Sequence, residues 1–413
     1  MIGLVTAPSQ RTLISIATYC SSINNQAFSH FLSQSPWDHR DLTTWITERG
    51  WRTIGKKGAL VIDECGNPKA GKHSVGVNRQ YCGNIGKVDN CQVGVFMAYT
   101  KGDRRLLLNY RLYLPTEWIT DPARCDVAGI PKEHRVFKTK AELAYEMIGE
   151  AKRAKIPFTH IAMDGFYGNH PWLLTRLEKE NLIYVADVGS DTRVYCEAPE
   201  YQIPKRQGTR GRMPVHTQVV NTPPIRVDSI AKKVDKWRTI RIRESMDGFL
   251  EVKFCAVRVW RIDKDVPQPI PVWLLIRKEL DDSDVKYSFC NALENTALSH
   301  LARMQSQRFW IERSFQDANQ LAGMNNYQVR NWNAWHHHMA LVLLAMLWIT
   351  QELMQALSVR KKLTLHDIVR IIKYLIPPKI QDALSVARRI VMNEKNRINS
   401  RKCKMKRNKR ALT

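Results

Sequence analysis

The stretch GALVID at residues 58–63 opens the part of the chain that decides its fold. It is an apolar run of strand length that ends in Asp63. Two more such runs follow, CQVGVFMAYT at residues 91–100 and RLLLNYRLYLP at residues 105–115. Apolar runs with period-two character predict strands. Three of them in succession predict an antiparallel ladder.

Helical and strand-like segments alternate after this ladder. Residues 138–155 carry apolar side chains at helical spacing, and HIAMD at residues 160–164 is another apolar strand that ends in an aspartate. Residues 169–180 predict a second helix, and LIYVADVG at residues 182–189 predicts a fifth strand. The order β-β-β-α-β-α-β indicates an α/β protein with a mixed five-stranded sheet and flanking helices.

The remaining sequence divides by composition. Residues 191–290 combine a linker rich in Pro and Arg, PKRQGTRGRMP, with strand-like runs and a hairpin expected at Asp247-Gly248, which predicts a β-rich insertion subdomain. Helical patterns return beyond it. We expect a helical N-terminal region (1–55), an α/β core in two parts (56–190 and 291–350) around the β insertion (191–290), and C-terminal helices with a basic tail (351–413). The N-terminal region could bind DNA or dimerise, or form a helical collar packed on the core.

The charge of the chain points to a polyanionic partner. The 413 residues include 64 Lys and Arg against 39 Asp and Glu, which gives a net charge of +25. Nucleic acid is the leading candidate, because cations that neutralise phosphates release bound counterions. An anionic membrane is the rival, but the apolar run Met339–Ile349 is well short of the ~20 residues that a spanning helix needs. The first residues lack the pattern of an export signal. We therefore expect a cytoplasmic, nucleoid-associated protein without a membrane partner.

The spacing of the cysteines and of three consecutive histidines argues against a metal site built from these residues. The nine cysteines are scattered and form no CxxC pair, which argues against zinc ribbons, zinc fingers and redox dithiols and predicts free thiols. His336, His337 and His338 are consecutive. Side chains at consecutive helix positions point about 100° apart and cannot all face one ion.

Carboxylates offer a different kind of site. Asp63 and Asp164 each end an apolar run that reads as a strand buried on both faces, where an unpaired charge is costly and a metal ion would compensate it. Glu312 lies on a polar stripe of a predicted amphipathic helix and can point toward the strand ends. Such oxygen ligands suit a pair of Mg²⁺ ions about 3.5–4 Å apart, with Asp63 as the bridging ligand, and this arrangement serves phosphoryl transfer. A satisfied strand-end aspartate and a surface Glu–Arg pair are the structural alternatives.

The chain resembles bacterial insertion-sequence transposases of the DDE type, and most of all the IS701 group, which is related to the IS4 group. Four segments carry the resemblance, and they span roughly residues 58–350 in the order of the family: residues 60–95, LYLPTEWITDPARCDVAGIP (112–131), HIAMDGFYG (160–168) and RFWIERSFQDANQLAGMNNYQVRNWNAWHHHMAL (308–341). The resemblance implies an RNase H-like core with Asp63, Asp164 and Glu312 as catalytic and metal-binding residues. It also implies an enzyme that cuts DNA at terminal inverted repeats and joins the 3′-hydroxyl ends to target DNA.

IS4-like relatives carry a Y-x2-R-x3-E-x6-K signature around the glutamate, whose polar residues contact phosphates. Arg308 and Glu312 fit this signature here, whereas Gln305 stands at the Tyr position and Asn319 at the Lys position. The departures leave the acid in place and concern how the end DNA is held. Relatives usually carry a longer helical segment ahead of the SPWD stretch at residues 35–38, so the N-terminus is expected to be shortened.

Several further residues are candidates for contacts with DNA. Lys69, Lys72, Arg79 and Lys87 lie among glycines near the first aspartate and could track phosphates, although turn glycines and solvated lysines are the alternative. Trp237 and Trp260 lie among arginines, a composition that suits unpaired or flipped bases as well as ordinary core packing. Tyr167, three residues after Asp164, could contact the scissile strand or pack inside.

These observations favour a Mg²⁺-dependent DDE transposase, in which Mn²⁺ can replace Mg²⁺, acting on double-stranded DNA at terminal repeats and target sites. Two ends must be brought together, so we expect a homodimer or a higher assembly. A catalytically inactive transposase-derived DNA-binding protein is the alternative from another class, and a hydrolytic nuclease without strand transfer is the alternative enzyme.

Overall fold

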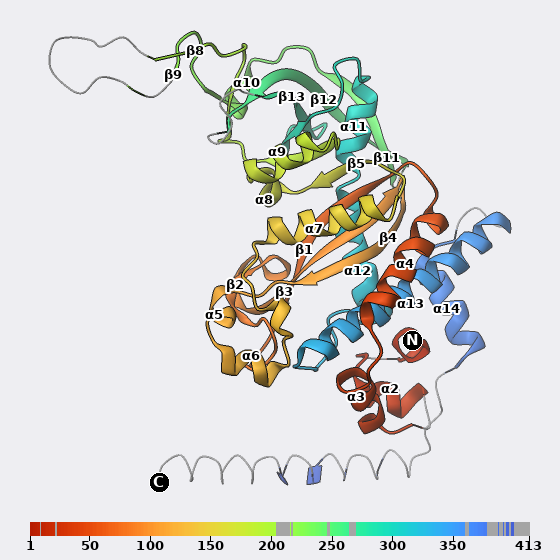
Figure 1. The fold of residues 1–413 in the computed structure, drawn as a ribbon. Coiled ribbons are helices and arrows are strands. Elements are labelled where there is room, and N and C mark those ends of the chain that lie inside the picture. Colours follow the sequence, from red (N-terminus) through yellow and green to blue (C-terminus); the bar gives the residue numbers. More distant parts are fainter. Residues whose placement is uncertain are drawn as a thin grey trace.

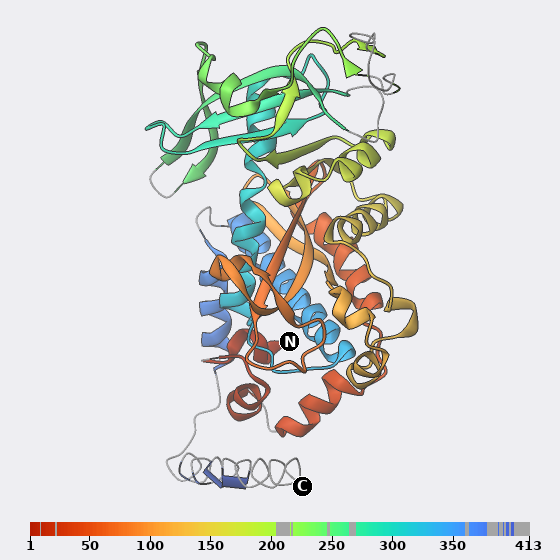
Figure 2. The same cartoon turned by 90° about the vertical axis from the view of Figure 1, so that its left-hand side faces the viewer.

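A computed structural model of the chain describes residues 1–8, 10–20, 23–203, 215, 218–245, 248–263, 270–359 and 363–377, together with 387, 391, 394–395 and 398–399. The linker expected at residues 204–214 and the basic tail beyond Asn399 lie outside these residues. The described chain is elongated, with the β-rich part at one end and the N-terminal helices at the other (Figures 1 and 2).

A mixed sheet forms the centre of the molecule (Figure 1). Five of its strands lie side by side in the order β4-β3-β1-β5-β6. Their bounds are Gly58–Pro68 (β1), Lys87–Lys101 (β3), Arg104–Leu112 (β4), Phe158–Met163 (β5) and Tyr184–Val188 (β6). β1 is antiparallel to β3 and parallel to β5, and β5 is parallel to β6. The α/β class and the five expected strands are confirmed, although β1 continues five residues past Asp63.

One strand of this region was not predicted. β2 (Asn78–Cys82) forms a hairpin with the start of β3 through the short helix η1 (Gly83–Ile85). Its first four residues, NRQY, alternate between half-buried and exposed positions, and the strand contains no apolar run, so the hydrophobic pattern that marks the other strands is absent. The Asn84 side chain donates to the carbonyl oxygen of Gly66, which ties the hairpin to the end of β1.

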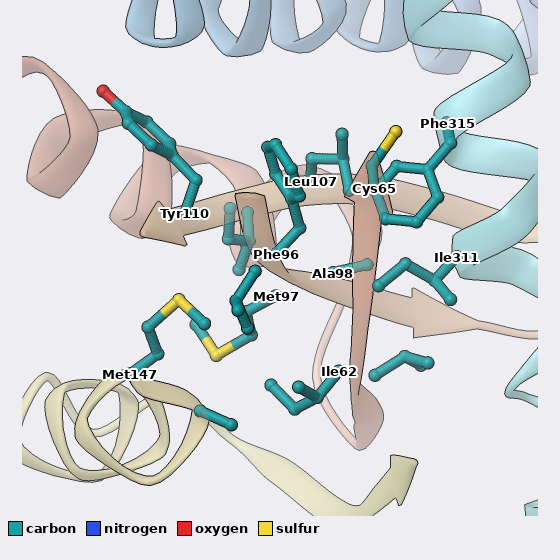
Figure 3. Close-up of a cluster of buried hydrophobic side chains, with 14 of the residues drawn as sticks. Ile62, Cys65, Phe96, Met97, Ala98, Leu107, Tyr110, Met147, Ile311 and Phe315 are labelled. Carbon is teal, nitrogen blue, oxygen red and sulfur yellow. The ribbon is translucent and has the colours of Figure 1, made fainter. Parts of the chain in front are cut away.

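Helices cover both faces of the sheet. On one face lie α7 (Lys140–Arg153), α8 (Gly165–Gly168) and α9 (Pro171–Lys179), and on the other α11 (Leu298–Ser306) and α12 (Phe309–Ala322). α7 begins with a capping box in which Thr139 and Glu142 satisfy each other's backbone N–H groups. Adjacent residues of β3 face the two layers (Figure 3), since Phe96 contacts Phe315 of α12 while Met97 lies beside Met147 of α7. Both faces of the central strands are therefore buried, which explains their continuous apolar sequence.

The segment predicted as a β insertion continues the same sheet. Its strands are β7 (Arg193–Tyr195), β10 (Ile225–Arg226), β11 (Arg238–Ser245), β12 (Gly248–Arg261), β13 (Ile270–Lys278) and β14 (Val285–Cys290), and β8 (Tyr201–Gln202) pairs separately with β9 (Gln218–Val219). β14 is hydrogen-bonded antiparallel to β6, so the insertion and the core share one twelve-stranded sheet in the described chain. This pairing covers what would be the open edge of β6. β11 and β12 form the expected hairpin, whose two turn residues, 246 and 247, lie outside the described residues.

Helices at the two ends of the chain pack on the core. The N-terminal ones are α1 (Ile2–Thr6), α2 (Leu13–Cys20), α3 (Asn25–Ser33) and α4 (His39–Ile54), and the C-terminal ones are α13 (Trp332–Val359) and α14 (Leu365–Leu375). The remaining short elements are α5 (Thr116–Ile119), α6 (Pro122–Ala128), η2 (Lys132–His134) and α10 (Val227–Lys232). α4 packs on α13 and β4, and the Thr47 hydroxyl donates to the carbonyl oxygen of Leu108. The N-terminal helices thus form a collar around the core helix α13.

α13 is longer than the apolar run Met339–Ile349 suggests. With 28 residues it is the one helix in the described part of the chain that has the length and hydropathy to cross a membrane. It contacts α4, α12 and α14, and its residues Ala340, Leu343 and Ile349 are buried. These contacts are those of a core helix.

Candidate active site

Three aspartates lie in a row at one level of three neighbouring parallel strands, where the pairing of β1 with β5 ends. Ile62 of β1 is the register partner of Met163 of β5, and Met163 is in turn the partner of Ala186 of β6. The next residues along the three strands are Asp63, Asp164 and Asp187. Neighbouring strands lie about 4.8 Å apart. The two predicted aspartates are therefore adjacent, and a third one continues the row.

The sequence analysis missed Asp187, although the same signal marks it. LIYVAD ends an apolar run in an aspartate, as GALVID and HIAMD do. Parallel strands present their carboxyl ends at one edge of the sheet, so all three acids could have been grouped.

The local backbone determines how two of these carboxylates point. Asp63 Oδ1 accepts a hydrogen bond from the N–H of Glu64 at 2.7 Å. Asp164 is the N-cap of α8, and its Oδ1 accepts from the N–H groups of Phe166 and Tyr167 at 3.0 and 3.4 Å. Because side chains alternate along a strand, Asp63 faces the α12 layer and Glu64 faces α7.

Arg308 brings the acids of the α12 layer together. Its guanidinium lies 2.9 Å (Nε) from Asp187 Oδ2, 2.7 Å (Nη2) from Glu312 Oε1 and 3.7 Å (Nη1) from Asp63 Oδ2. Arg308 stands at the start of α12, and Glu312 follows it by one helical turn. The structure thus brings Asp63, Asp187 and Glu312 around one cation, while Asp164 lies beside Asp63 on the next strand.

The electrostatics of the site reflect this crowding. Burial and the neighbouring Asp164 raise the pKa of Asp63 above its usual range, against the opposing effect of Arg308. Burial also raises the pKa of Asp164, whereas Arg308 and the two N-cap hydrogen bonds lower it. Burial by itself would lower the pKa of Arg308, but Asp187, Glu312, Asp63 and Asp164 raise it. The site has an excess of negative charge that favours a bound cation.

Hydrogen bonds hold Asp187 in place. The Ser288 hydroxyl on β14 donates to Asp187 Oδ1 at 2.6 Å, and Gln305 Nε2 donates to Ser288 Oγ at 2.8 Å. Ser288 is fully buried and Gln305 is 4% exposed. Gln305, the residue at the Tyr position of the IS4-like signature, therefore supports the carboxylate that binds Arg308.

The carboxylates fit a cation by their chemistry. Mg²⁺ prefers carboxylate oxygens, and Asp63, Asp164 and Glu312 supply them from two strands and a helix. Within the described ranges no group of three or more His, Cys, Asp or Glu side chains is already arranged as a metal site. The Arg308 guanidinium lies among these oxygens instead.

The other face of β1 carries a second polar cluster. Lys140 Nζ pairs with Glu64 Oε1 at 2.6 Å. Tyr167 is fully buried, and its hydroxyl has no hydrogen-bond partner among the residues that the structure describes. Of the two roles considered for Tyr167, packing inside the protein fits this burial, because the ring offers no surface to DNA.

The predicted basic contacts separate into two kinds. Lys72, Arg79 and Lys87 are exposed. Lys69 is half-buried, because its Nζ lies 3.7 Å from the centre of the Tyr327 ring and donates to the Tyr327 carbonyl oxygen at 3.3 Å. Burial lowers the pKa of Lys69 to about 8. Lys69 is thus attached to the protein, while the other three can reach a phosphate backbone.

The two tryptophans do not come together. Trp260 and Trp237 lie on opposite faces of the β11–β14 strands, since Trp260 shares a face with Arg258, whereas Trp237 contacts Lys278 at 4.4 Å on the other face. Trp237 packs against the main core, and Trp260 is half-buried. Asn319 is half-buried on α12, and its buried Oδ1 has no hydrogen-bond partner in the described chain.

Histidines and cysteines contribute no metal site within the described residues. His336, His337 and His338 bond to different backbone carbonyls, those of Trp332, of Leu32 and Trp37, and of Met324. Seven cysteines are free, which confirms the expectation for Cys65, Cys82, Cys91, Cys125, Cys196, Cys255 and Cys290. A cavity of about 520 Å³ lies between α4, β4 and α7, and none of the clustered carboxylates lines it.

Comparison with known proteins identifies the family. Residues 1–248 match the family of DDE superfamily endonucleases, a region that contains Asp63 and Asp164 and ends before Glu312. The probable transposase for insertion sequence element IS701 from Microchaete diplosiphon is 29% identical over 192 residues. This match covers 46% of the chain and 47% of that protein, so the chain spans about half the length of the curated relative it matches. The family match covers more than half of the chain, and the expected resemblance is confirmed at this level: the chain belongs to the DDE superfamily endonucleases.

Proposed function

We propose that this protein is a transposase of the IS701 type that cuts DNA at the terminal inverted repeats of an insertion sequence and joins the 3′-hydroxyl ends to target DNA. The pairing of Asp63 and Glu312 with the Arg308 guanidinium, with Asp164 beside Asp63 on the next strand, carries the proposal. The strand order β4-β3-β1-β5-β6, with Asp63 and Asp164 at the same level of β1 and β5, supports an RNase H-like core. The relative named as a probable transposase supports the reaction class.

The acids of the chain would hold two Mg²⁺ ions, or Mn²⁺ in their place, through Asp63, Asp164 and Glu312. Bound ions would supply activation of the attacking water or 3′-hydroxyl and stabilisation of the leaving oxygen in an in-line displacement. Asp63 is 8% exposed, so its carboxylate is shielded from water, whereas the Glu312 side chain is 47% exposed and can be reached by a phosphodiester. A charge on Asp63 interacts strongly with a cation because the surroundings are poorly solvated.

The remaining chain would bind the DNA around this site. Lys72, Arg79 and Lys87 are exposed cations of the segment that follows the Asp63 strand. Arg79 and Lys87 belong to the β2–β3 hairpin, whose η1 helix is hydrogen-bonded to Gly66, roughly 10 Å along β1 from Asp63. Phosphate contacts at these positions would set the register of the duplex. A reaction on two ends calls for a homodimer or a larger assembly.

A strand-transfer assay separates this proposal from its two alternatives. Labelled DNA carrying the ends of the protein's own locus is incubated with a target plasmid, Mg²⁺ and the full chain. Joined product supports the transposase. Cleavage without joining would replace it with a hydrolytic nuclease, and specific binding without cleavage would replace it with a DNA-binding protein derived from such an enzyme.

A further inference from the structure

Arg308 is the one cation that directly contacts the carboxylates of the candidate site in the described chain. Its guanidinium reaches Asp63, Asp187 and Glu312 with three different nitrogens, and its side chain is only 21% exposed. Asp164 also raises the pKa of Arg308, so a fourth carboxylate acts electrostatically on the guanidinium. An arginine in contact with DNA would extend toward solvent, whereas this one points inward.

Asp187 is the acid that determines this inward position. Its Oδ2 accepts from Nε, the guanidinium nitrogen nearest the backbone, at 2.9 Å. Its Oδ1 accepts from the buried Ser288, which in turn accepts from the buried Gln305. The carboxylate of Asp187 therefore has little freedom to follow Arg308 outward, and it is not among the proposed metal ligands.

We infer that Asp187, held by Ser288 and Gln305, positions Arg308 as a built-in cation in the carboxylate cluster, and that divalent metal ions must displace this cation to bind. The inference rests on the metal site of the proposed function. It makes Asp187 a positioning residue and gives Arg308 two positions, one among the carboxylates and one free for a phosphate.

Charge balance explains why such a cation is needed. Four carboxylates in a poorly solvated site repel one another, and a buried carboxylate without a counterion is costly. Lys140 cannot supply the charge, because it pairs with Glu64 on the opposite face of β1. A guanidinium and a metal ion that neutralise the same oxygens cannot both occupy them fully, so their binding is mutually antagonistic.

Mn²⁺ affinity of the full-length protein tests the inference without any catalysis. Free Mn²⁺ is followed by electron paramagnetic resonance for the wild type, Arg308→Gln, Ser288→Ala and Asp187→Asn. Arg308→Gln should bind Mn²⁺ about tenfold more tightly, as expected when a competing cation is removed. Ser288→Ala changes no charge and removes the hydrogen bond that Ser288 donates to Asp187, so the affinity for Mn²⁺ should rise about threefold.

Asp187→Asn separates tethering from simple electrostatics. Removing a negative charge from the site would by itself weaken Mn²⁺ binding, whereas releasing Arg308 should strengthen it. Tighter Mn²⁺ binding in this variant supports the inference that Asp187 holds Arg308 among the carboxylates. Weaker or unchanged Mn²⁺ binding in both Asp187→Asn and Ser288→Ala would overturn that inference.

Thermal unfolding supplies a second readout and a matched control. Arg308→Gln should lower the Tm in EDTA and recover most of the loss with Mn²⁺, because the metal replaces the missing cation. Arg105→Gln removes another arginine that is paired with a buried carboxylate of α12, Asp317, and should lower the Tm equally with and without Mn²⁺. A wild type that fails to bind Mn²⁺ would contradict the metal site of the proposed function itself. A wild type that binds Mn²⁺, with variants whose Mn²⁺ affinity is the same, would contradict only the role of Asp187 in positioning Arg308.

Discussion

Asp63 and Asp164 stand at the same level on two neighbouring parallel strands, because the residues before them, Ile62 and Met163, are register partners. Their side chains come from segments that are about 100 residues apart in the sequence, yet burial raises the pKa of both carboxyls, and the neighbouring Asp164 raises that of Asp63 further. Carboxyl groups with shifted pKa values cluster at functional sites.

Glu312→Gln is predicted to abolish DNA cleavage while leaving the fold intact. The side chain is 47% exposed, so an isosteric amide costs little stability, but it removes a ligand charge from the site. We expect cleavage to fall about a thousandfold or more, by analogy with other losses of essential catalytic groups. Cleavage rates and circular dichroism spectra check both parts. Gln316→Ala, an exposed position on the next turn of α12, is the control and should cleave normally; a Glu312→Gln enzyme with near wild-type rates would exclude this residue from the site.

Arg79→Ala and Lys87→Ala are predicted to weaken DNA binding by reducing its electrostatic part. Both side chains are exposed on the β2–β3 hairpin. Each lost phosphate contact should reduce the slope of log K against log salt by about 0.9. Fluorescence anisotropy over a salt series measures the slope. The control is Lys152→Ala on α7, which should leave the salt slope unchanged. Equal slopes for all three variants would mean that DNA does not follow the hairpin.

Arg105→Met is predicted to destabilise the fold strongly. Arg105 Nη2 lies 2.6 Å from Asp317 Oδ2, and the Asp317 side chain is 2% exposed. Removing the arginine leaves a buried carboxylate whose one remaining ion pair among the described residues is with Arg313 at 3.6 Å, which should cost about 3–5 kcal/mol of unfolding free energy. Urea denaturation measures this change. The double variant with Asp317→Leu should recover part of the loss, and a loss below about 1 kcal/mol would show that the pair is well solvated.

Stability is predicted to fall in mild acid because His160 is buried in its neutral form. Burial lowers the pKa of His160 to about 4, compared with about 6.5 in the unfolded chain. Between these values the unfolded state binds more protons, so stability is complete above about pH 6.5 and is lost as the pH falls toward 4, by at most about 3 kcal/mol. Urea denaturation at several pH values should show a flatter profile for His160→Leu. The exposed His73→Ala is the control, and an identical profile for both variants would contradict the assignment.

The sequence predicted the parts of the fold that have strong hydrophobic patterns. The apolar runs of β1, β5 and β6 mark strands buried on both faces, and the helix that carries Glu312 shows a clear polar stripe. Asp63 and Asp164 end two of these runs, so the hydrophobic pattern pointed to two of the clustered carboxylates.

Other features depend on contacts that a sequence pattern does not contain. β2 is polar and short, and only its hydrogen bonds with β3 define it as a strand. The pairing of β14 with β6, which joins the insertion to the core, links residues about 100 positions apart. The inward orientation of Arg308 likewise follows from Asp187 and Ser288, which come from different strands. Trp237 and Trp260 are similar by composition, and strand register alone separates them.

The most direct test of the account is metal-dependent cleavage of DNA from the ends of the protein's own locus by the wild type and by Asp164→Asn. The account predicts strand cleavage at the repeat ends with Mg²⁺, none with EDTA and none with Asp164→Asn, whose amide can still cap α8. Cleavage that persists in EDTA or in Asp164→Asn would contradict the assignment of these carboxylates as the catalytic site.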